Sequence, residues 1–154
     1  MKKILFFNIN NEQLPEILIY KNYFGKHGFI CEYSHNISES QHSEYPIHWY
    51  IMGTDISFPF KSKPKILIHE YQSASIGNMS ALKDMVKKTR FISRKPDLRI
   101  FQSRSINEHY AFSDNVPFIY RDMGYTPEIN SIKGSKSRKD IDFLYIGSLD
   151  KKET

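Results

Sequence analysis

Cysteine is almost absent from this 154-residue chain, which contains only Cys31. A single thiol can form neither an intrachain disulfide nor a cysteine-based zinc site, so neither kind of cross-link stabilises the fold. Cys31 lies in a β-prone stretch, and we expect it to pack against the core from a strand.

Long apolar runs are absent as well. No stretch approaches the roughly 20 apolar residues that a membrane-spanning helix needs. The apolar run near the N-terminus is short and lacks a small-residue cleavage site, so it does not have the form of a signal peptide. We therefore expect a cytoplasmic protein. With 40% hydrophobic and 14% aromatic residues, the chain can build one domain with a proper core.

Glycine is missing where a dinucleotide-binding protein would need it. The first apolar run is followed by residues 8–13, NINNEQ, without the glycines that let a pyrophosphate approach the backbone. The chain also has no GxxxxGK(S/T) phosphate loop, no GxSxG nucleophile elbow and no HExxH motif. A classical NAD-binding domain is therefore not expected.

Acidic residues are outnumbered, 17 against 22 Lys and Arg, which gives a formal net charge of +5. This excess favours an anionic partner: a nucleic acid, an anionic membrane surface or a phosphorylated small molecule. Basic and aromatic residues are not interleaved on one element and form no known motif, so we expect no nucleic acid. The basic helix within residues 83–95 either contacts the inner face of a membrane or is a solvated helix face.

What the sequence does contain is an alternation of strand and helix patterns. Apolar β-prone runs occupy residues 3–9, 29–34, 47–52, 65–69, 98–102 and 116–120. Helical spacing of apolar residues is found at 13–27, 78–91 and 106–112. This order predicts an α/β fold with a Rossmann-like, largely parallel, doubly wound sheet.

The last part of the chain suggests a domain boundary. Residues 133–140 are small, polar and charged, as in a linker, and residues 141–146 form a further apolar β-prone run. We expect a domain at 1–132, a linker at 133–140, and at 141–154 the first strand of a truncated second domain. Alternatively, the last strand closes the sheet of a single domain.

The richest loop follows the fourth predicted strand, at the edge where parallel sheets bind ligands. It offers an imidazole, a carboxylate, two hydroxyls and a glycine before a helix: His69, Glu70, Ser73, Ser75 and Gly77. We expect His69 and Glu70 to lie nearest the chemistry, because an acceptor hydroxyl needs a hydrogen-bond or proton acceptor within about 3 Å. The alternatives are that Ser75 only caps the helix and that His69 is a core histidine.

A second polar loop follows the sixth predicted strand. Arg121 and Asp122 are adjacent there and either bind an anion or form a local ion pair. An exposed pair of this kind contributes only about 0 to 1 kcal/mol, so stability is a poor reason for it.

With these residues in view, the chain resembles the N-terminal half of a GT-B glycosyltransferase of the retaining, sugar-nucleotide-dependent type that builds bacterial surface glycans. The likeness rests on HEYQSASIGNMSALKDMVKK, on KPDLRIFQSRSINEHYAF, and on VPFIYRDMGY followed by DFLYIGSLDKKE. It covers almost the whole chain.

The resemblance implies an acceptor-side domain that faces a donor-side domain across a cleft. It implies a nucleotide-sugar donor, a glycan or lipid-linked acceptor, and no cofactor or metal, because basic side chains and helix N-termini stabilise the leaving diphosphate. By the same likeness Gly147, Lys151 and Lys152 would contact donor phosphate. Ser148 stands where that class often has an arginine.

Two functions therefore follow from the sequence. The first is a hexosyltransferase of which this fragment alone is inactive, with Ser73, Ser75, Gly77, Arg121 and Asp122 binding substrate. The second is a non-catalytic Rossmann-like domain that binds a nucleotide or a carbohydrate.

Overall fold

The structure of the protein is a computed structural model, which describes residues 2–9, 14–53, 63–75, 79–89 and 94–122. The expected linker and the strand at 141–146 lie outside these residues. The described elements alternate strands with helices in the following order: β1 (Lys2–Phe7), α1 (Pro15–Lys26), β2 (Phe29–Ser34), α2 (Glu39–Glu44), β3 (Ile47–Ile51), β4 (Ile66–Tyr71), α3 (Ser80–Thr89), β5 (Leu98–Phe101), α4 (Arg104–Tyr110) and β6 (Phe118–Tyr120).

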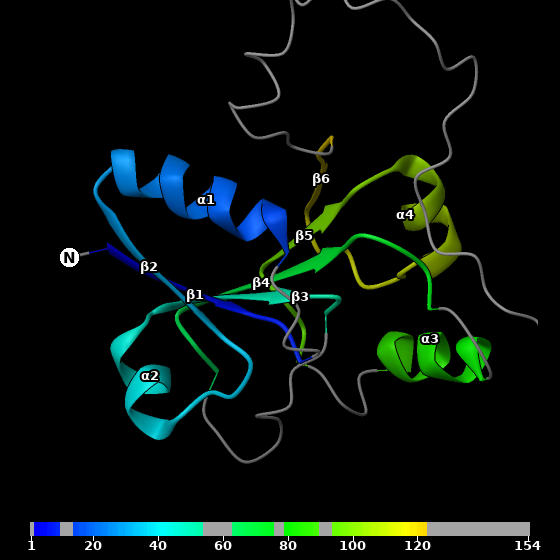
Figure 1. The fold of residues 1–154 in the computed structure, drawn as a ribbon. Helices are drawn as coiled ribbons and strands as arrows, with labels where there is room; N and C mark the ends of the chain where they lie inside the picture. Colours follow the sequence, from blue (N-terminus) through cyan, green and yellow to red (C-terminus); the bar gives the residue numbers. More distant parts are fainter. Residues whose placement is uncertain (1, 10–13, 54–62, 76–78, 90–93, 123–154) are drawn as a thin grey trace, which may run out of the picture.

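The six strands form one sheet in the order β2-β1-β3-β4-β5-β6, and every neighbouring pair is parallel. The predicted Rossmann-like α/β class is therefore confirmed. Figure 1 shows α1 on one face of the sheet and α2 and α3 on the opposite face. This distribution follows from right-handed crossovers, because the chain first moves from β1 to β2 at one edge and then reverses toward β6.

Both faces of the sheet carry apolar cores. On the α1 face a core forms around Phe6, Ile17 and Trp49, and Cys31 of β2 packs against it as expected. On the other face Phe7, Tyr50 and Leu67 belong to a second core, and a third joins Tyr71 and Phe101 to Tyr110 of α4. Two buried faces explain why the central strands are continuous apolar runs rather than alternating ones.

Two elements differ from the sequence prediction. Residues 39–44, expected as part of a polar loop, form α2, which begins with a capping box: Ser38 Oγ accepts from the Gln41 amide at 3.2 Å. The Ser-x-x-Gln spacing is the sequence signal for that start. The fourth strand continues through Tyr71 rather than ending at His69, so Glu70 belongs to β4 and not to the loop after it.

Within the described residues, no helix is long and apolar enough to cross a membrane.

Candidate functional site at the carboxyl edge of the sheet

The strand order places a topological switch point between β1 and β3, because the chain leaves β1 for β2 at one edge and returns to β3 on the other side of β1. Ligands of open parallel sheets bind outside the carboxyl ends of the strands near such a point. Figure 1 shows β3, β4 and β5 ending on the same side of the molecule. The ends of β4, β5 and β6 continue this side of the sheet next to β3 and carry the described residues of the predicted site, so we take them as the candidate edge.

Glu70 is the centre of this edge on the α1 face. Its side chain is fully buried, at 0% exposure. One carboxylate oxygen, Oε1, accepts from Gln72 Nε2 at 3.0 Å and from Arg121 Nε at 2.8 Å, and Arg121 Nη2 also donates to it. The other, Oε2, accepts from Trp49 Nε1 at 2.8 Å and from the Tyr20 hydroxyl at 3.1 Å.

Strand alternation brings these groups together. Glu70 shares the α1 face with Ile68, and its register partner across the sheet is Ile51 of β3. Tyr20 reaches over from α1, where its ring stacks on Phe6 with a centroid distance of 5.6 Å and lies 4.8 Å from Trp49. The aromatic rings exclude water from the carboxylate while their polar tips donate to it.

Arg121 compensates the buried charge. It follows β6, and its side chain is 14% exposed. Burial acts to lower the pKa of Arg121, but the Glu70 carboxylate outweighs it and the pKa is raised. Burial first and Glu70 second raise the pKa of Tyr20. The cluster therefore joins the Glu70 carboxylate to a guanidinium and a neutral phenol.

His69 points to the opposite face of the sheet, since successive side chains of a strand alternate. Its imidazole is 1% exposed, and burial, with Arg99 as the next cause, lowers its pKa to about 3. Nδ1 lies 3.4 Å from the Tyr71 hydroxyl, while Nε2 is buried without a hydrogen-bond partner. The structure thus does not bring His69 and Glu70 together.

Arg99, the cation that helps to lower the pKa of His69, belongs to a buried ion pair. Arg99 of β5 donates to both oxygens of Asp114, at 2.5 and 2.7 Å, and its guanidinium lies 3.8 Å from the Phe112 ring centroid. This pair fixes the segment between α4 and β6 against the sheet.

A second polar cluster, which the sequence analysis missed, lies around Asp84 of α3. The Asp84 carboxylate accepts from the Ser75 amide at 3.3 Å, from the Tyr110 hydroxyl at 3.1 Å and from His109 Nε2 at 2.7 Å. Lys87 Nζ donates to Ser75 Oγ at 3.0 Å. Only the i,i+3 spacing of Asp84 and Lys87 was visible in the sequence, because the other partners come from α4 and from the segment after β4.

Ionisation in this second cluster follows from its contacts. Burial acts to raise the pKa of Asp84, but hydrogen bonds from Ser75, His109 and Tyr110 outweigh it and lower the pKa to about 2. Burial lowers the pKa of Lys87 although Asp84 opposes it. The cluster anchors the chain after β4 to α3 and α4.

The remaining predicted site residues are placed as follows. Ser73 is exposed, and its carbonyl accepts from the Tyr110 hydroxyl at 3.2 Å. Asp122 is exposed, and its carbonyl accepts from Arg121 Nη1 at 3.0 Å. Gly77, Gly147, Lys151 and Lys152 lie outside the described residues.

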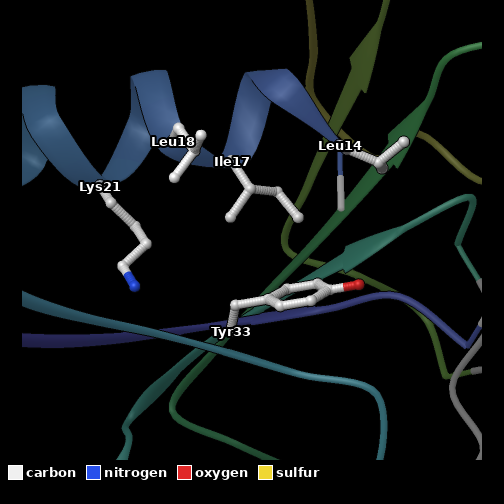
Figure 2. Close-up of a pocket in the computed structure, with 5 residues that line it drawn as sticks. All are labelled: Leu14, Ile17, Leu18, Lys21 and Tyr33. Atoms are coloured by element: carbon white, nitrogen blue, oxygen red, sulfur yellow. The ribbon is translucent and has the colours of Figure 1, made fainter. Parts of the chain in front are cut away.

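A small pocket of about 190 Å³ lies between α1 and β2, on the side of β1 opposite β4. It is lined by Leu14, Ile17, Leu18, Lys21 and Tyr33, and Figure 2 shows Ile17 and Lys21 descending from α1 toward the Tyr33 ring. Its volume is below the roughly 300 Å³ at which ligand pockets usually begin. We therefore place the candidate site at the carboxyl edge.

The parallel sheet and the helices that flank it define a Rossmann-like α/β domain. Comparisons with protein-family models, with curated proteins and with solved structures find no significant match to this chain.

Proposed function

We propose that this chain is the acceptor-side half of a retaining GT-B glycosyltransferase, which transfers a hexosyl group from a nucleotide sugar to a hydroxyl of a glycan or lipid-linked acceptor. One observation carries the proposal. The described parts of the segments that resemble that class, within residues 69–88, 95–112 and 116–122, fold into one contiguous half of the sheet, β4 to β6. Their polar side chains gather at the carboxyl edge, where a parallel sheet binds its ligand.

Arg121 is the residue that we propose contacts an anionic group of the substrate. Its guanidinium is oriented by hydrogen bonds to Glu70, and its side chain remains 14% exposed. An oriented guanidinium binds carboxylate or phosphate oxygens through paired hydrogen bonds. Glu70 acts here as a positioning residue, because both of its oxygens already accept hydrogen bonds.

His69 is a neutral imidazole in the folded protein, and with 1% exposure it supports the edge from within the sheet rather than contacting the acceptor. Ser73 and Ser75 would contact the acceptor from the segment after β4. No metal or cofactor takes part, and Gly77, Gly147, Lys151 and Lys152 keep the roles that the resemblance implies.

A non-catalytic domain that binds a nucleotide or a carbohydrate is the second candidate, and one observation favours it. Among the described residues of the edge, the Glu70 carboxylate already accepts hydrogen bonds on both oxygens, and the His69 imidazole is buried. Such an arrangement can position a ligand without taking a proton from it.

Calorimetry separates the acceptor-side half from a nucleotide-binding domain, and the transfer assay on the full-length gene product separates it from a carbohydrate-binding domain. The 154-residue chain is titrated with UDP-, GDP- and ADP-sugars and with oligosaccharides of the acceptor type. We expect oligosaccharide binding and weak or no nucleotide-sugar binding, with no turnover by this chain alone. Tight nucleotide-sugar binding without oligosaccharide binding would favour the second candidate, and robust turnover would contradict the division into acceptor and donor halves.

The site assignment is tested in the full-length gene product with a donor-sugar transfer assay. Arg121→Gln should lower kcat/KM by about 100-fold, the scale of a lost charged contact to the transition state. Lys65→Gln, at an exposed position just before β4 and so at the opposite edge of the sheet, is the control and should leave kcat/KM unchanged. Equal rates for both variants would remove Arg121 from the site.

A further inference from the structure

Helix α3 is oriented with its polar side toward the body of the protein. The side chains of Asp84 and Lys87 are 6% and 11% exposed. Both take part in the cluster with Ser75 and Tyr110. These contacts fix the rotation of the helix about its axis.

The apolar side of α3 consequently faces outward. Met79, Leu82 and Met85 are 65%, 43% and 53% exposed. At about 100° per residue, Leu82 and Met85 lie opposite the arc that carries Asp84 and Lys87. Figure 1 shows α3 at the outside of the fold, on the face opposite α1. A surface helix normally shows the reverse arrangement.

The charge on the exposed side of α3 has one sign. Asp84 is the only acidic residue of the helix, and its carboxylate is buried. Lys83 and Lys88 are exposed on the two flanks of the apolar row, and Lys88 Nζ also donates to the His109 carbonyl at 2.8 Å. The surface is therefore an apolar row between two lysines, with no carboxylate of the helix exposed.

We propose that α3 docks the protein on an anionic bilayer surface. Met79, Leu82 and Met85 enter the boundary between headgroups and acyl chains, and Lys83 and Lys88 contact anionic headgroups. This inference does not depend on the proposed transferase activity, because it rests only on the orientation and charge of α3.

The dimensions and chemistry of the surface favour lipid over a second protein. A stable protein interface buries about 800 Å² on each partner, more than three side chains of one short helix supply. Methionine side chains are flexible and adapt to an irregular surface such as the acyl boundary. The flanking lysines complement anionic headgroups. Each lysine near an anionic surface raises the binding constant by about fivefold.

The experiment is co-sedimentation of the 154-residue chain with two kinds of vesicle, phosphatidylcholine alone and phosphatidylcholine with one-third phosphatidylglycerol. We expect binding to the anionic vesicles that weakens as salt is raised. Leu82→Ser/Met85→Ser should lower the partition coefficient by tenfold or more. Lys83→Gln/Lys88→Gln should lower it by about twentyfold.

Controls carry single changes of the same kind on α1: Leu18→Ser, at a residue that is 62% exposed, and Lys26→Gln, also exposed. Both should bind vesicles as the unmodified chain does, and thermal melts should show every variant folded. The proposal is overturned if anionic vesicles are not bound or if the α1 controls lose as much binding as the α3 variants. It is also overturned if the α3 face instead forms a dimer that Leu82→Ser/Met85→Ser abolishes.

Discussion

The Glu70 carboxylate joins four separate parts of the chain at the scale of a single residue. Its donors come from α1, β3, the segment after β4 and the segment after β6. Removing one member of a buried ion pair leaves the other charge uncompensated, and this costs about 3–5 kcal/mol. Glu70 is therefore a stability residue as well as a positioning residue.

Glu70→Ala should lower the free energy of unfolding by about 3–5 kcal/mol, because Arg121 would remain buried without its partner. Urea unfolding measures this loss. Glu70→Gln/Arg121→Gln should lose less stability than the sum of Glu70→Gln and Arg121→Gln, as a double-mutant cycle would show. The control is Lys63→Ala, which breaks an ion pair whose side chains are 42% and 43% exposed and should cost about 1 kcal/mol or less. Equal losses for Glu70→Ala and Lys63→Ala would contradict the account of the buried pair.

His69 makes stability depend on pH in a defined direction. Its pKa is lowered to about 3 in the folded state, so between that value and its ordinary pKa the unfolded chain binds the extra proton. Stability from His69 is fully present above the unfolded pKa and is lost as pH falls through that window. The loss between pH 7 and pH 5 should be about 2 kcal/mol.

His69→Phe keeps a ring of similar size and removes the titrating group. Its free energy of unfolding should match that of the unmodified chain at pH 7 and exceed it by about 2 kcal/mol at pH 5, measured by urea unfolding at both values. Other acid-sensitive groups, such as Asp84, remain in both proteins and cancel in the difference. An identical pH slope for the two proteins would show that His69 is not buried in its neutral form.

At the scale of elements, β3 and β4 meet closely where both strands end. Gly53, after β3, has a positive φ of 65°, and a Cβ built there would lie 2.4–2.6 Å from the Tyr71 ring. That ring is 1% exposed and packs 4.8 Å from Tyr110 and 5.4 Å from Phe101, so it has little room to move. The end of β3 therefore requires glycine for two independent reasons.

Gly53→Ala should lower the free energy of unfolding by more than about 2 kcal/mol, from backbone strain and the clash with Tyr71. Gly25→Ala is the control within a helix, where nothing lies within 4 Å of the added Cβ, and it should raise stability by about 0.5–1 kcal/mol. Thermal or urea unfolding gives both values. A loss of less than about 2 kcal/mol for Gly53→Ala would mean that the Tyr71 side chain moves aside at little cost.

At the scale of the whole molecule, the sheet could be predicted from the sequence and the site only in part. Apolar runs buried on both faces identify parallel strands, and the order of elements predicts the class of fold. The contact between Glu70 and Arg121 joins residues 51 positions apart and depends on the register of β6 against β5 and β4. The outward rotation of α3 could not be predicted either, because periodicity identifies an apolar side but not the direction in which it points.

The link from Glu70 to Arg121 also ties the edge strand β6 to the centre of the sheet. Phe118, Ile119 and Tyr120 of β6 are 49%, 50% and 45% exposed, so β6 buries little surface of its own. Local stability follows buried contacts, and we expect slow amide hydrogen exchange in β1, β3 and β4 and faster exchange in β6.

Glu70→Gln should therefore accelerate exchange in β6 more than in β2, the opposite edge strand, because only β6 is followed directly by Arg121. Hydrogen exchange followed by NMR at constant pH resolves the two strands, and β2 serves as the internal reference. If the substitution accelerated both edges equally, the loss would be global rather than a release of β6. Unchanged exchange in β6 would mean that backbone pairing with β5 alone holds that strand, and that Glu70 does not couple the edge of the sheet to its centre.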